Sequence, residues 1–149
     1  MRLLEKERRI VQRLMIVPEV GERLAIIESI GAAFRAKPKG VIEATISIPE
    51  CSSDLHVVVT TMKDRISLYP EASSTFVRGM ARVVCSVFDG EPIVDVIGYQ
   101  TNILSATGIW GELSTVRQLG MSGLLTRLEN CFTDLRVLTQ RRVTTSKMS

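Results

Sequence analysis

Residues 41–69 read VIEATISIPECSSDLHVVVTTMKDRISLY, and this stretch decides the fold. In residues 42–48, apolar side chains alternate with polar ones, which is typical of a strand with one buried face. Residues 55–62 are β-branched and apolar on both parities, which indicates a central strand that is covered on both faces. Residues 63–65, KDR, predict a tight turn into a third short strand at 66–69. Connections this short predict an antiparallel meander.

Two helices are expected before the sheet. Apolar residues recur at helical spacing from Leu3 onward, with one gap at Glu7. The pattern restarts at Pro18, a residue that suits the first turn of a helix, and the apolar stripe runs on to Phe34. The proline and glycine of AKPKG then end the helical period before the first strand.

Helices are also expected after the sheet. Ser73 or Ser74 can cap a helix that Gly90 ends, and a long final helix begins near Ser114. The sequence therefore predicts one α+β domain over residues 1–149, with a small antiparallel three-stranded sheet packed against helices. Its expected parts are N-terminal helices at 2–35, the sheet at 41–70, helices at 73–138 and a frayed, polar tail at 139–149.

The charge and composition of the chain argue against two classes of partner. The net charge of +3 comes from 19 basic and 16 acidic residues that are interleaved, so no basic surface for nucleic acid is indicated. Four Phe, two Tyr and one Trp are too few for a platform on which single strands stack. No apolar run approaches the ~20 residues of a membrane span. We therefore expect neither a nucleic-acid partner nor a membrane partner.

The N-terminal stretch, MRLLEKERRIVQRLM, is rich in Arg and Leu and raises the question of a transit peptide. It contains Glu5 and Glu7 and has no Ser, whereas transit peptides are poor in acids and rich in Ser. We interpret it as the first helix of the fold and expect a cytoplasmic location. The stroma or matrix of an organelle stays open for a eukaryotic source.

The three cysteines differ in their surroundings. They form no CxxC pair, and a single histidine cannot complete a cluster, so we expect no metal site and no cofactor. Cys85 and Cys131 lie on apolar helical stripes, where free cysteine is usually buried. Cys51 lies in an exposed polar corner between two strands, which makes it the candidate functional thiol.

The neighbours of Cys51 limit the chemistry expected of it. Glu50 and Asp54 disfavour a second negative charge nearby, which argues against a cysteine protease with a strongly activated thiolate. They argue less against a sulfur acceptor, because the best attacking thiol has a pKa near ambient pH. His56 is the only candidate base. In a regular strand it points to the face opposite Cys51, so a Cys–His dyad is disfavoured.

Four blocks of the sequence together resemble the SufE family, the sulfur-acceptor partners of SufS-type cysteine desulfurases. They follow the order of the family, with nearly its spacing, over roughly residues 10–130. The resemblance implies an α+β fold with the reactive cysteine in a loop beside the sheet. The blocks are VGERLAIIESIG at 20–31, ISIPECSSDLHV at 46–57, FVRGMARVVCSVFDGEPIVDV at 76–96 and STVRQLGMSGLLTRL at 114–128.

The resemblance also implies roles for individual residues. Cys51 matches the persulfide-forming cysteine of the family, and Ser53 matches the serine two residues after it. Arg117 matches the arginine that lies near the reactive loop and the partner enzyme. The sequence departs from the pattern at several positions, and beside the cysteine Glu50 replaces a glycine and His56 replaces a tryptophan. We expect Arg117 to offset the charge of Glu50 and to help hold a persulfide anion.

The function that the resemblance implies is sulfur transfer. It implies that Cys51 accepts sulfur from the persulfide of a pyridoxal-phosphate-dependent cysteine desulfurase and passes it to an Fe–S scaffold protein. On this interpretation we expect the protein to hold no cofactor of its own and to activate the desulfurase rather than to act as a stand-alone enzyme. The alternative is a SufE-like adaptor that binds and regulates a partner without carrying sulfur. Cys51 favours the carrier, while Glu50 and His56 leave the adaptor open.

Overall fold

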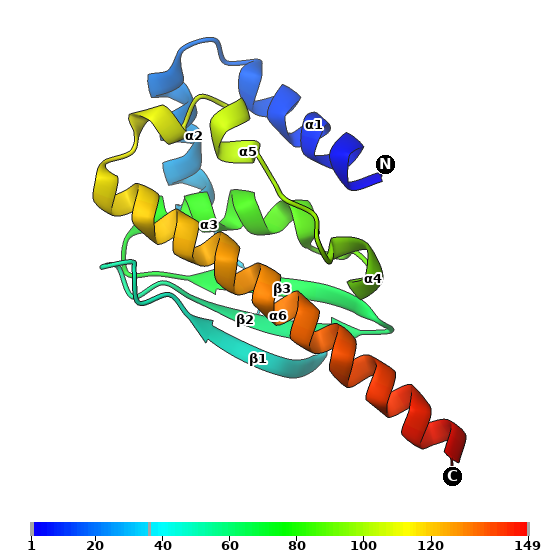
Figure 1. Cartoon of the computed structure of the whole chain (residues 1–149). Coiled ribbons are helices and arrows are strands. Elements are labelled where there is room, and N and C mark those ends of the chain that lie inside the picture. Colours follow the sequence, from blue (N-terminus) through cyan, green and yellow to red (C-terminus); the bar gives the residue numbers. More distant parts are fainter. Residues whose placement is uncertain (1, 36, 149) are drawn as a thin grey trace.

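The computed structural model describes residues 2–35 and 37–148, which form an α+β fold as predicted (Figure 1). Most of the apolar core lies between the sheet and the helices that cover it. No described helix is long and apolar enough to cross a membrane. The elements are α1 (Arg2–Met15), α2 (Val20–Ala32), β1 (Val41–Ser47), β2 (His56–Met62), β3 (Arg65–Glu71), α3 (Thr75–Phe88), α4 (Ile93–Val96), α5 (Ile103–Ala106), η1 (Trp110–Glu112) and α6 (Thr115–Met148).

The sheet is the predicted antiparallel meander, in the order β1-β2-β3. Lys63 and Asp64 form the two-residue turn between β2 and β3, with φ values of 53° and 63°. A turn with positive φ at both central residues matches the twist of the strands that it joins. The central strand is covered less evenly than its sequence suggested. Val57 and Val59 are fully buried on one face, whereas Val58 on the other face is only half-buried.

Strand β1 departs from the expected pattern of one buried face. Its register against β2 shifts between Ile42 and Ala44, and Ile42 is 63% exposed. The shift inserts Glu43 into the strand, where its carboxylate accepts a hydrogen bond of 2.7 Å from the Thr61 hydroxyl. Because an extra residue inverts the alternation of side chains, the first part of β1 does not contribute to the core.

Helices α2 and α3 approach each other so closely that two glycines are required. A Cβ atom on Gly31 would lie 1.8 Å from the Thr75 carbonyl oxygen, and one on Gly79 would lie 2.0 Å from the Ile27 carbonyl oxygen. Helix α3 in turn packs against β3, and α6 packs against β1 (Figure 1). The contact between α2 and α3 therefore fixes the N-terminal helices relative to the sheet.

Helix α3 begins and ends as expected. The Ser74 hydroxyl accepts a hydrogen bond of 3.3 Å from the Val77 amide and so caps its N-terminus. The helix ends at Phe88, just before Gly90. Ser74 is thus the cap among the two candidate serines.

The N-terminal helices differ from their expected pattern at two positions. Glu7 is not a gap in the buried face, because it is only 6% exposed and accepts hydrogen bonds from the Thr101 hydroxyl and the Asn102 amide. Phe34 does not continue the stripe of α2. It lies beyond the last helical residue, Ala32, and is 94% exposed. The chain has left the helix before Phe34, so helical spacing no longer places its side chain on the buried face.

The final helix is longer than predicted. A frayed tail was expected from residue 139, but α6 continues to Met148. Residues 139–148 contain neither glycine nor proline, so no residue type there interrupts the helical hydrogen bonds. Polar composition alone was a poor sign of a helix end.

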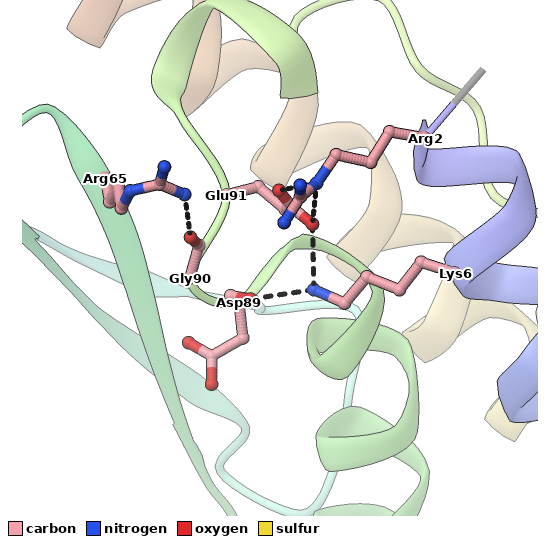
Figure 2. A network of polar contacts seen from close by, with 6 residues as sticks. All are labelled: Arg2, Lys6, Arg65, Asp89, Gly90 and Glu91. Atoms are coloured by element: carbon pink, nitrogen blue, oxygen red, sulfur yellow. Dashed lines mark hydrogen bonds and ion pairs between the residues drawn. The ribbon is translucent and has the colours of Figure 1, made fainter.

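A buried carboxylate ties α1 to the connection between α3 and α4 (Figure 2). Glu91 is 2% exposed and lies 3.1 Å from the Arg2 guanidinium and 3.3 Å from the Lys6 ammonium. The Lys6 ammonium also donates to the Asp89 carbonyl oxygen, and the Arg65 guanidinium donates to the neighbouring Gly90 carbonyl oxygen. A carboxylate that is buried to this extent requires such partners. The network fixes the first turns of α1 beside the end of α3.

Candidate functional site

Cys51 lies in the loop between β1 and β2. Ile48 and Leu55 close this loop at its base, where the Ile48 amide donates to the Leu55 carbonyl oxygen at 2.9 Å. Both side chains are 2% exposed. The Cys51 amide donates to the Ile48 carbonyl oxygen at 3.1 Å, which makes a tight turn through Pro49 and Glu50. Buried anchors and this turn give the thiol a defined position at the corner of the sheet.

The first part of α6 partly covers the thiol. Cys51 is half-buried, not exposed as the polar loop suggested. A Cβ atom on Gly120 would lie 3.2 Å from the Cys51 Cβ atom and 3.5 Å from its Sγ atom. Long-range packing of α6 over the loop, which the local sequence does not reveal, therefore accounts for the reduced exposure. The glycine leaves the space that the thiol occupies.

Cys51 opens into a pocket with a volume of about 310 Å³ between the loop, α3 and the start of α6. The resemblance matched Cys51, Ser53 and Arg117 to residues of the family pattern, and all three line this pocket. The Ser53 carbonyl oxygen accepts hydrogen bonds from the amide and hydroxyl of Ser73, at 2.8 and 3.0 Å, which joins the loop to the segment before α3. The lining residues are Cys51, Ser52, Ser53, Val77, Met80, Ser114, Val116, Arg117 and Met121.

Arg117, which lines this pocket, packs against an aromatic ring. Its guanidinium lies 4.8 Å from the centre of the Phe76 ring, a cation–π contact between α6 and α3. Its amide donates to the Ser114 hydroxyl at 3.3 Å, so the residue belongs to the capped first turn of α6. A planar guanidinium that rests on a ring keeps its edge N–H groups available for an anion.

The expected pairing of Arg117 with Glu50 is wrong. The Glu50 carboxylate binds Arg127 instead, at 2.8 Å to Nη2 and 3.3 Å to Nε. Arg127 lies ten residues after Arg117, about 15 Å further along α6. Gly123 makes room for this contact, since a Cβ atom there would lie 2.7 Å from the Glu50 carboxylate oxygen. Arg127 carries no local signal that identifies it as the partner of a residue in a distant loop.

The ion pair changes the titration of both groups. The hydrogen bond from Arg127 lowers the pKa of the Glu50 carboxyl below its ordinary value. The same hydrogen bond raises the pKa of Arg127. Glu50 also does not have a positive φ, so its backbone does not need the glycine that the family has at this position. The charge beside Cys51 is thus neutralised by α6.

His56 does not join Cys51 in a catalytic pair. It begins β2, and its Nδ1 atom donates to the Asp54 carbonyl oxygen at 3.1 Å. It is absent from the residues that line the Cys51 pocket. The structure therefore does not bring together the dyad that a cysteine hydrolase needs.

The other two cysteines do not line the Cys51 pocket, and burial raises the pKa of both thiols. Cys85 is 1% exposed in α3, and burial raises the pKa of its thiol far above the ordinary value. Cys131 is half-buried rather than fully buried, and burial raises the pKa of its thiol to about 11. At neutral pH such thiols are protonated and poor nucleophiles. Among the described residues, no group of His, Cys, Asp and Glu is placed to hold a metal ion.

Fold and site together define an α+β domain that presents one cysteine in a loop beside its sheet. A profile of the SufE family, described as an Fe-S metabolism associated domain, matches residues 8–131. The chain belongs to the SufE family, as its sequence blocks indicated.

Two relatives agree with this assignment, and one solved structure shares the fold. Two uncharacterised SufE-like proteins from two strains of Mycobacterium tuberculosis are each 23% identical over 112 residues, covering 72% of this chain and 78% of theirs. The solution structure of a hypothetical protein from Thermus thermophilus has the same fold. Its TM-score is 0.70 at 18% identity, over 87% of this chain and 94% of that one.

Proposed function

We propose that this protein accepts sulfur as a persulfide on Cys51 and passes it on during the assembly of Fe–S clusters. The proposed donor is a pyridoxal-phosphate-dependent cysteine desulfurase of the SufS type, and the proposed acceptor is an Fe–S scaffold protein. The observation that carries the proposal is the shared pocket of Cys51 and Arg117 in a member of a family associated with Fe–S metabolism.

The transfer is a thiol–disulfide type of exchange that balances without a further reactant. The Cys51 thiolate attacks the outer sulfur of the desulfurase persulfide. A new S–S bond forms at Cys51, the original S–S bond breaks, and the desulfurase cysteine leaves as a thiolate. A thiolate of the scaffold then attacks the outer sulfur on Cys51 in the same way. Neither step requires an external oxidant or reductant.

The pocket suits a bound persulfide for two reasons. Val77, Met80 and Met121 contribute apolar side chains to its lining, against which the sulfur atoms of a persulfide can pack. Arg117 supplies a cation on the same pocket, where it favours the anionic form of the terminal sulfur. We assign Arg117 the role of holding this anion or an acidic group of the partner.

One observation favours the alternative, an adaptor that carries no sulfur. The loop of Cys51 is held to α6 by the pair of Glu50 and Arg127, and α6 partly covers the thiol. Both features restrict the reach of the thiol towards a partner. An adaptor of this kind binds the desulfurase without reacting with it.

Desulfurase turnover separates the two functions. Cysteine is the substrate, a purified SufS-type desulfurase is the enzyme, and the protein is titrated as wild type, Cys51→Ser and Cys131→Ala. A carrier requires Cys51, so wild type and Cys131→Ala stimulate turnover equally and Cys51→Ser does not. Stimulation that survives in Cys51→Ser would establish the adaptor and refute sulfur transfer through this residue.

A further inference from the structure

A second concave surface lies between α1, α2 and α3, and shares no described lining residue with the Cys51 pocket. This groove, called here the α1–α2 groove, has a volume of about 590 Å³. Leu14 and Val83 in its lining are buried, and the isoleucines are half-buried. Its apolar lining comprises Ile10 and Leu14 of α1, Ile26 and Ile30 of α2, and Val83 of α3.

Cations surround this apolar lining. Lys6, Arg9, Arg13 and Arg82 line the groove, and no acidic side chain does so among the residues that the structure describes. Two of the four cations are already held, because Lys6 binds Glu91 and Arg82 binds Glu71. Arg9 and Arg13 are exposed and form no ion pair with the described side chains of residues 2–35 and 37–138. They stand one helical turn apart on α1, where two like charges repel each other.

The walls of the groove are fixed in the absence of any partner. At one end, Arg2 and Lys6 bind the buried Glu91, which holds α1 beside the end of α3 (Figure 2). On the other wall, the Arg82 guanidinium donates to the carbonyl oxygens of Ile30 and Ala33 at the end of α2, at 2.6 and 2.8 Å. A groove whose walls are already in place binds a partner without paying the entropy of forming it.

We propose that the α1–α2 groove binds an amphipathic helical segment of a protein partner, with apolar residues on one face and carboxylates beside them. Charge complementarity carries this assignment, because carboxylates on the partner would pair with Arg9 and Arg13 while its apolar face covers the isoleucines. Arg9 and Arg13 have the spacing of residues on one helix face, which suits acids that recur at every turn of a partner helix. Membrane surfaces and nucleic acids are recognised by larger clusters of cations on open surfaces.

The test uses a synthetic peptide of about 14 residues, long enough for a marginal helix. It carries Leu at helical spacing with Glu on both sides and Ala elsewhere, and a second peptide has the same composition in shuffled order. Fluorescence anisotropy measures binding, and chemical-shift mapping on the labelled protein locates it. We expect the ordered peptide to bind with a Kd of about 10–100 µM, with shifts at residues 9–14, 26–30 and 82–86, and the shuffled peptide to bind far more weakly.

Arg8, the neighbour of Arg9 in α1, provides a matched control. Arg9→Glu and Arg13→Glu are each expected to weaken the ordered peptide about tenfold, whereas Arg8→Glu, which makes the same charge change outside the groove lining, has an effect below about twofold. Cys51→Ser binds the peptide like wild type, so the result does not depend on the sulfur chemistry.

Four outcomes would overturn the proposal. One is that Arg8→Glu and Arg9→Glu weaken binding of the ordered peptide equally. Another is a Kd above about 1 mM for the ordered peptide. A third is binding to vesicles of phosphatidylcholine and phosphatidylserine that requires Arg9 while the peptide fails to bind, which would assign the groove to lipid. The last is self-association in sedimentation experiments that Arg9→Glu abolishes, which would assign it to a second copy of this chain.

Discussion

The Glu50 carboxylate and the Arg127 guanidinium form a two-point ion pair that fastens the residue before Cys51 to the middle of α6. Glu50 stands where the SufE family pattern has a glycine. Gly123 on α6 leaves the space that the Glu50 carboxylate occupies. The pair therefore joins the candidate reactive loop to the longest helix of the fold.

Removal of Arg127 should expose the thiol. We expect Arg127→Ala to raise the rate of alkylation of Cys51 by iodoacetamide about two- to fivefold, because an exposed ion pair makes a small but real contribution to holding the loop. Mass spectrometry after short reaction times measures the rate at each cysteine. Arg136→Ala, on the same helix but outside this contact, serves as the control. Equal rates in wild type and Arg127→Ala would mean that the ion pair does not restrain the loop.

The pair should also depend on pH in a defined direction. Since the folded protein lowers the pKa of Glu50, the contribution of the pair to stability is present above the ordinary carboxyl pKa. It is lost as the pH falls through the lowered pKa of the folded protein. A carbon-detected NMR titration should place the Glu50 midpoint below that of an ordinary glutamate, and Arg127→Gln should move it back upward. A midpoint that Arg127→Gln leaves in place would contradict the geometry of the pair.

The close contact of α2 and α3 should not tolerate a methyl group. A Cβ atom on Gly31 would meet the Thr75 backbone oxygen at 1.8 Å, so Gly31→Ala should reduce the free energy of unfolding by at least about 2 kcal/mol. Gly21→Ala is the control in the same helix. A Cβ atom there meets nothing within 4 Å, so stability should stay constant or rise by up to about 1 kcal/mol. Urea denaturation measures both. Similar stabilities for the two variants would show that the helices do not approach this closely.

Arg117 should affect sulfur transfer more than stability. Its guanidinium rests on Phe76 and lines the Cys51 pocket, so Arg117→Ala should slow the stimulation of a desulfurase about tenfold or more while the melting temperature changes little. Arg117→Lys keeps the charge but not the planar stack and should recover only part of the rate. If Arg117→Ala stimulates the desulfurase as well as the wild type does, Arg117 has no role in sulfur transfer.

Much of the fold followed from local patterns. The alternation in β1, the β-branched run of β2 and the short turn at Lys63 and Asp64 each carry a signal within a few residues. Those signals predicted the order and direction of the strands correctly. Ser74 was identified as a possible helix cap because a serine just before an apolar helical pattern is also a local signal.

The errors arose where distant segments meet. Phe34 looked like part of an apolar stripe, yet the helix ends before it. The partner of Glu50 was assigned to Arg117 because a motif placed that arginine nearby, whereas the packing of α6 on the loop brings Arg127 to it. The partial burial of Cys51 depends on Gly120, which is remote in sequence. The periodic spacing of apolar residues along one sequence does not reveal contacts between such distant segments.

The most direct test of sulfur transfer is the mass of the protein after reaction with a cysteine desulfurase and cysteine in the absence of reductant. Transfer adds one sulfur atom, about 32 Da, and we expect peptide mapping to place it on Cys51. Cys85, which is buried, and Cys131, whose thiol pKa is raised to about 11, should stay unmodified in the folded protein. Added sulfur on Cys85 or Cys131 with Cys51 unmodified, or no added mass while the desulfurase is turning over, would contradict the account.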